Sequence, residues 1–204
     1  DLVDTIGVRP ARLEVIHNPF DVDEIRRLAD EPCRMAGEDY LVSVGRFSPQ
    51  KRYDRLLGAF ARARYAGRLV IAGTGTGEQI RTVAERARGL GIADRVDLVG
   101  FVENPYPIMK HARALVLSSD FEGFGNVLVE SLICGTPALS TRCPHGPDEI
   151  LAGGLSVGLA DLTEESLAEA IDRLTRDPPT INEEHVRPFR VQAIADRYLA
   201  LGEG

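Results

Sequence analysis

Short apolar segments alternate with helical patterns along most of this chain, and the alternation limits the available folds more than any other feature. Most of these segments are apolar nearly throughout, which is typical of parallel strands covered on both faces. Strands are expected at 13–16, 40–45, 68–73, 95–100, 114–119 and 137–141. Helices are expected at 23–30, 53–65, 77–90, 104–112, 126–134, 164–176 and 187–202. Strands separated by single helices indicate an α/β fold with a doubly wound, Rossmann-like parallel sheet and helices on both faces.

The composition argues against several classes of protein. With 204 residues and 44% hydrophobic residues, the chain can form one domain with a sizeable core. A formal net charge of −7 argues against a nucleic acid partner, because phosphate binding needs a basic surface. Three cysteines without CxxC spacing argue against a disulfide framework or zinc site and favour a reducing compartment. No apolar run approaches the roughly 20 residues of a membrane span, and no signal peptide is recognisable.

The most informative loop follows the expected strand 114–119 and reads EGFGNVLVE over 122–130. In an open parallel sheet, ligands bind beyond the carboxyl ends of the strands. Two glycines permit a tight turn, and a helix beginning near Asn126 would present free N–H groups and its positive end to an anion. Glu122 precedes this helix, and Glu130 lies about one turn inside it, where it can accept two hydrogen bonds from a vicinal diol. The loop therefore suits a nucleotide-sugar; the alternative is an ordinary capped helix with one exposed glutamate.

Two cations follow the neighbouring strand 40–45 at the same edge of the expected sheet. Arg46 offers a planar fork of donors and Lys51 a compact positive charge, and both suit a diphosphate. Solvated surface charge is the alternative for each of them. Their position at the edge that also carries the 122–130 loop favours a shared anion site.

Three other motifs have simpler explanations. The GTGTG run at 73–77 fails the dinucleotide pattern GxGxxG, because Glu78 stands where the third glycine belongs. The acidic pair in 21–23 opens a helix, so N-capping explains it without a metal ion. The turn at 143–151 can line a donor pocket through backbone N–H groups, with His145 as an ordinary exposed histidine; nothing orients Cys143 beside it as a nucleophile.

Together these motifs resemble family 4 of the retaining GT-B glycosyltransferases. The resemblance covers roughly 12–200 and rests on the VGR…K loop, the glycine turn after RLVIAG, the DLVGFV segment, and EGFGNVLVE as the family's E-x7-E motif. It implies transfer of a sugar, with retention, from a nucleoside diphosphate-sugar to a glycan or lipid-linked acceptor. UDP is favoured over GDP as the nucleotide, no metal or other cofactor is needed, and bacterial polysaccharide or glycoconjugate biosynthesis is the expected setting.

The resemblance also implies the role of each site residue. Glu122, the catalytic position, lies against the donor sugar, and Glu130 holds the ribose hydroxyls. Arg46 and Lys51 bind the diphosphate, and the segment after DLVG holds the base. The implied donor-binding residues are Arg46, Lys51, Phe101, Val102, Phe124, Gly125, Asn126, Val127 and Glu130.

Members of that family consist of two Rossmann-like domains with the active site between them. Residues 1–204 resemble the C-terminal, donor-binding domain, so we expect an acceptor-binding N-terminal domain to be absent from this sequence. The isolated chain is then expected to bind nucleotide and to be inactive. The full-length protein is expected in the cytoplasm, at the inner face of the membrane. Two alternatives remain at this point: a sugar-nucleotide epimerase, and a non-catalytic nucleotide-sugar-binding module.

Overall fold

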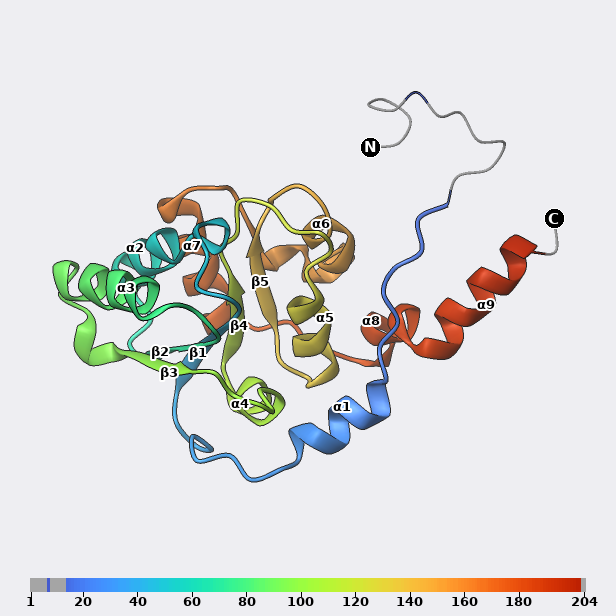
Figure 1. The fold of residues 1–204 in the computed structure, drawn as a ribbon, viewed down its shortest axis with the longest axis horizontal. Coiled ribbons are helices and arrows are strands. Elements are labelled where there is room, and N and C mark those ends of the chain that lie inside the picture. Colours follow the sequence, from blue (N-terminus) through green and yellow to red (C-terminus); the bar gives the residue numbers. More distant parts are fainter. Residues whose placement is uncertain (1–6, 8–13, 203–204) are drawn as a thin grey trace.

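A six-stranded parallel sheet in the order β3-β2-β1-β4-β5-β6 forms the centre of the protein (Figure 1). This computed structural model describes residues 7 and 14–202. The strands are β1 Tyr40–Val44, β2 Arg68–Ala72, β3 Val96–Gly100, β4 Ala114–Leu117, β5 Ala138–Thr141 and β6 Leu159–Ala160. The α-helices are α1 Val22–Ala29, α2 Tyr53–Arg62, α3 Gly77–Gly89, α4 Tyr106–His111, α5 Asn126–Ile133, α6 Pro147–Ile150, α7 Glu164–Arg176, α8 Glu183–Val186 and α9 Val191–Gly202. The predicted α/β class and doubly wound parallel sheet are confirmed.

The core consists of two apolar layers, one on each face of the sheet. Side chains alternate along the strands, so that Leu41 and Leu69 pack on α2, α3 and α7, whereas Val42 and Val70 pack on α1, α4 and α5. Figure 1 shows the two groups of helices on opposite sides of the sheet. Burial on both faces explains why these strands are apolar nearly throughout.

The prediction of a strand at 13–16 is wrong for residues 14–16, which form no regular structure; Leu13 lies outside the described residues. The apolar pattern there resembles a strand, but Val15 is 65% exposed. Its carbonyl accepts a hydrogen bond from Arg197 of α9 at 2.7 Å, in place of a bond from a neighbouring strand. Both edges of β1 are already occupied, by β2 and β4.

The sequence interpretation missed β6, α6 and α8, each only two to four residues long. It also extended the second helix to residue 65, whereas α2 ends at Arg62. The capping interpretation of the acidic pair is confirmed, because the Asp21 side chain accepts a hydrogen bond from the Glu24 N–H at 3.0 Å.

The C-terminal helix α9 projects away from the sheet, with the two ends of the described chain on the same side of the molecule (Figure 1). Val191 and Leu199 on this helix are exposed, whereas Ile194 is buried. Within the described residues, no helix has the length and apolar character needed to cross a membrane.

Candidate functional site

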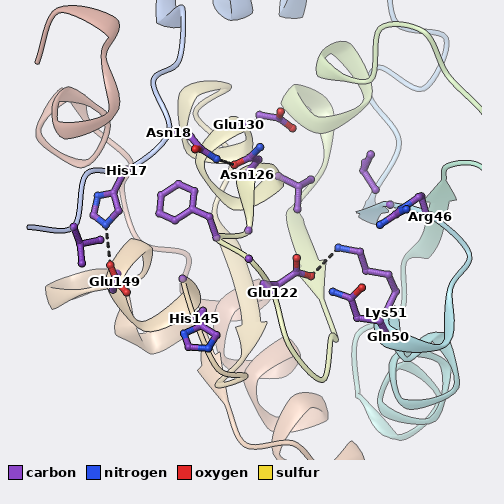
Figure 2. A pocket seen from close by; sticks show the side chains of 18 of the residues that line it. His17, Asn18, Arg46, Gln50, Lys51, Glu122, Asn126, Glu130, His145 and Glu149 are labelled. Carbon is purple, nitrogen blue, oxygen red and sulfur yellow. Dashed lines mark hydrogen bonds and ion pairs between the residues drawn. The ribbon is translucent and has the colours of Figure 1, made fainter. Parts of the chain in front are cut away.

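A cavity of about 850 Å³ opens at the carboxyl ends of β1 and β4 (Figure 2). Its walls come from the segment before α1, the loop after β1, the β4–α5 loop with the start of α5, and the turn before α6. The lining residues are Val15, Ile16, His17, Asn18, Val44, Gly45, Arg46, Gln50, Lys51, Glu122, Gly123, Phe124, Gly125, Asn126, Val127, Glu130, His145, Gly146 and Glu149. Both glutamates and both cations of the sequence interpretation therefore meet in one cavity, as do Phe124, Gly125, Asn126 and Val127.

Glu122 is buried at the floor of this cavity. Its Oε1 accepts hydrogen bonds from Lys51 Nζ at 2.7 Å and from Ser119 Oγ at 2.6 Å. No group in the described part of the chain donates to Oε2. One carboxylate oxygen is thus fixed by the protein, and the other is available to a ligand.

A network of ion pairs, with the buried Arg55 at its centre, fixes the loop that carries Glu122. Asp120 accepts hydrogen bonds from Arg55 at 2.6 Å and from Arg52 at 3.0 Å, and Arg55, which is only 6% exposed, also donates to the Ser118 carbonyl at 2.8 Å. Desolvation raises the pKa of Asp120, but the bonds from Arg55 and Arg52 outweigh it and hold the pKa below its usual value. The sequence interpretation missed this network, because its partners lie 65 and 68 positions apart and no local pattern joins them.

Helix α5 begins at Asn126, as predicted, and its first turn is left open. Gly125 adopts a left-handed conformation with φ of 93°, and no side chain caps the helix. Within the described residues, the N–H groups of Asn126 and Val127 have no hydrogen-bond acceptor. Free N–H groups at the positive end of a helix form a natural anion site, and both residues line the cavity.

Glu130 lies one turn inside α5 and has no partner among the described residues. Its carboxylate lines the cavity but makes no hydrogen bond or ion pair with any other described residue. Burial raises the pKa of the Glu130 carboxyl. A half-buried carboxylate without donors is unfavourable, so a ligand with hydroxyl groups would satisfy it.

Arg46 and Lys51 lie on the same side of the cavity, with Lys51 directed at Glu122 (Figure 2). Arg46 is exposed and makes no hydrogen bond or ion pair with the described part of the chain. Its guanidinium can therefore bind an anion without breaking an existing contact. Lys51 has only one of its three N–H donors engaged within the described residues.

Phe101 and Val102 do not line this cavity. They follow β3, at the edge of the sheet, where Phe101 is 71% exposed and Val102 packs against the core. Their proposed role in holding the base stays a prediction.

The segment before α1 and the turn before α6 complete the cavity, and the sequence interpretation missed the contribution of the former. The His17 ring stacks on Phe124 with centroids 4.9 Å apart, and its Nε2 lies 2.8 Å from Glu149 Oε2. Asn18 donates to the Asn126 side chain at 2.8 Å. These contacts join residues more than 100 positions apart, so only the folded chain reveals them.

His145 lines the cavity from the turn before α6 and has no hydrogen-bond or ionic partner in the described chain. The adjacent Gly146 must be glycine, because a Cβ there would clash with the Phe124 carbonyl. Burial raises the pKa of the Cys143 thiol to about 11, which argues against a nucleophilic role. Among the residues that the structure describes, no cluster of His, Cys, Asp or Glu could hold a metal ion.

The parallel sheet and the cavity at its carboxyl edge define a Rossmann-like domain of the GT-B class. The structure of Anabaena Alr3699/HepE in complex with UDP and glucose shares the fold, with a TM-score of 0.79 and 21% identity over 93% of this chain and 56% of that one. Residues 29–188 match the family described as glycosyl transferases group 1, and the chain belongs to this family.

Two bacterial relatives are similar to this chain in sequence. One is the N-acetylgalactosamine-N,N'-diacetylbacillosaminyl-diphospho-undecaprenol 4-alpha-N-acetylgalactosaminyltransferase of Campylobacter jejuni, 33% identical over 74% of this chain and 40% of its own length. The other is the lipopolysaccharide 1,6-galactosyltransferase of Salmonella typhimurium, 31% identical over 74% of this chain and 42% of its own length. The chain thus spans about two fifths of each of these relatives.

Proposed function

We propose that this chain is the donor-binding half of a retaining glycosyltransferase that uses a nucleoside diphosphate-sugar, with UDP favoured over GDP. The observation that carries the proposal is the convergence of two glutamates, two cations and an open helix N-terminus on one cavity. The UDP and UDP-glucose complexes of Alr3699/HepE, which has the same fold, support the choice of nucleotide.

The diphosphate is proposed to lie over the start of α5. There Asn126 and Val127, whose N–H groups have no acceptor among the described residues, line the cavity together with the cations Arg46 and Lys51. These groups would stabilise the negative charge that develops on the leaving diphosphate as the sugar departs. Because cations and the helix end perform this task, the proposed reaction needs no metal ion.

The two glutamates are proposed to hold the two hydroxyl-bearing parts of the donor. Neither oxygen of Glu130 receives a hydrogen bond from the part of the chain that the structure describes, and the carboxylate suits the vicinal hydroxyls of the ribose. Glu122 presents Oε2 to the sugar, with its position set by Lys51 and Ser119. In this arrangement Glu122 orients the sugar at the reacting carbon.

The acceptor is proposed to be a glycan or a lipid-linked glycan. The names of the Salmonella and Campylobacter relatives, a lipopolysaccharide galactosyltransferase and an enzyme acting on a diphospho-undecaprenol, support this class of acceptor. With such an acceptor, we propose that the whole protein acts at the cytoplasmic face of a membrane and that a second domain supplies the acceptor site.

A thermal-shift screen of nucleotides and nucleoside diphosphate-sugars on this chain tests the proposal. Binding to the folded state raises the melting temperature by mass action, so UDP and UDP-sugars should raise it more than GDP, and NAD should have no effect. The proposal fails if no nucleoside diphosphate shifts the melting temperature.

For the full-length protein, NMR of the product should show that the anomeric configuration of the donor is kept. An epimerase would instead convert the donor without any acceptor.

A further inference from the structure

The buried contact between Lys51 and Glu122 has an electrostatic consequence for the diphosphate. Their side chains are 14% and 10% exposed, and Nζ lies 2.7 Å from Oε1. At this distance and burial, two charges interact much more strongly than in water. The Glu122 carboxylate therefore offsets the charge of Lys51 at the point where the diphosphate is proposed to bind.

Glu122 cannot easily turn away from this position. Ser119, fully buried, donates to the same Oε1 at 2.6 Å, and the Thr141 hydroxyl donates to the Ser119 carbonyl at 2.7 Å. Arg46, by contrast, has no carboxylate beside it in the described chain. Any phosphate bound to Lys51 thus shares this ammonium with a second, fixed anion.

The intact donor and the spent nucleotide differ at this same point. In a nucleoside diphosphate-sugar, the sugar esterifies the terminal phosphate. After transfer, that phosphate carries a further ionisable oxygen, which is largely ionised at neutral pH because the second pKa of a phosphate monoester is about 6. The spent nucleotide also lacks the sugar hydroxyls that could donate to Glu122 Oε2.

We propose that Glu122 discriminates the intact donor from the spent nucleoside diphosphate by repelling the additional phosphate charge. The inference rests on the proposed function and adds a role for Glu122 in product release. The carboxylate weakens binding of the nucleoside diphosphate, while a hydrogen bond from the sugar compensates for the repulsion in the intact donor. Product then dissociates and fresh donor takes its place.

The test compares UDP and UDP-glucose in titration calorimetry on this chain and on Glu122→Gln, which keeps the shape and removes the charge. We expect the variant to bind UDP roughly five- to tenfold more tightly, at the low end of typical coupling between neighbouring sites. UDP-glucose affinity should change little or fall, so the ratio of the two affinities shifts towards UDP. UMP, which lacks the second phosphate, should show no gain.

Glu130→Gln is the matched control. It removes a carboxylate from the same cavity, but at the end proposed for the ribose, so UDP and UDP-glucose should both weaken by the same factor. If Glu122→Gln does not fold, Glu122→Ser offers a smaller neutral side chain for the same comparison. An unchanged or weaker UDP affinity in the folded variant overturns this inference alone, whereas absence of nucleotide binding by the unaltered chain overturns the proposed function with it.

Discussion

Glu122, in the loop before α5, and Glu130, one turn inside this helix, line the same cavity, yet their hydrogen-bond partners differ. Glu122 receives two hydrogen bonds on one oxygen and is paired with Lys51. Glu130 receives none within the described chain, and burial raises its pKa. The first carboxylate is part of the folded structure, whereas the second is left for a ligand to satisfy. Substitutions that separate stability from binding can test this difference.

Lys51→Ala should have the largest effect, because it removes the partner of a largely buried carboxylate. We expect a loss of about 3 kcal/mol in the free energy of unfolding, near the lower limit for breaking a buried ion pair. Urea denaturation measures it. The double variant Lys51→Ala with Glu122→Gln is the control and should recover much of the loss, because no unpaired charge remains. Equal stability of the single and double variants would contradict the ion-pair account.

Arg46→Ala should weaken UDP binding without weakening the fold. Arg46 is exposed and has no partner in the described chain, so its removal breaks no contact. Loss of a charged hydrogen bond to phosphate should cost about 1.5–3 kcal/mol in binding, or more than tenfold in affinity. Calorimetry with UDP and a urea melt measure the two quantities. Arg88→Ala, an exposed arginine in α3 that does not line the cavity, should change neither.

His17→Ala should destabilise the turn at 143–151, which borders the cavity. It removes the stacking on Phe124 and the contact with Glu149, which together should contribute about 1 kcal/mol. Hydrogen exchange of the backbone from 143 to 151 should speed up, while exchange in β1 and β4 stays slow. His17→Phe is the informative control, because it keeps the stacking and removes only the hydrogen bond. Unchanged exchange in His17→Ala would mean that this segment does not support the turn.

Glu130→Gln should have the smallest effect on stability, and it should raise the stability rather than lower it. Burial raises its folded pKa above the usual value of a glutamate, so the native state binds more protons than the unfolded state between the two pKa values. Stability therefore falls as pH rises through that interval, and the penalty is fully present at neutral pH. The variant should melt slightly higher than the unaltered chain at about pH 7.5, and the difference should vanish near about pH 4. A variant that melts lower at neutral pH would show that Glu130 has a partner in the fold.

The layer structure could be predicted from the sequence because it depends on local patterns. Val42 and Val70 belong to runs that are buried on both faces, and such runs are visible without any tertiary information. The strand β6 could not be predicted in this way, because its two residues, Leu159 and Ala160, are too few to form a pattern. The strand expected at 13–16 followed the apolar pattern, but residues 14–16 form no strand, and the Val15 carbonyl accepts its hydrogen bond from Arg197.

The candidate site was predictable to the extent that its residues lie in consecutive loops at one sheet edge. Glu122 and Lys51 could be placed together because β1 and β4 are neighbours in a parallel sheet. The stacking of His17 on Phe124 and the anchoring of Asp120 by Arg55 depend on the exact packing of distant segments. The positions of these residues carry no periodic signal, so the sequence could not predict these supporting contacts.

Titration calorimetry of UDP against this chain and against Glu130→Ala tests the central claim most directly, since it asks whether the carboxylate without a partner is a ligand site. Loss of its hydrogen bonds to the ribose should weaken binding by about 1–3 kcal/mol, or roughly 5- to 150-fold. Circular dichroism would confirm that the variant is folded. Equal affinity of the two proteins for UDP would remove Glu130 from the site and contradict the account.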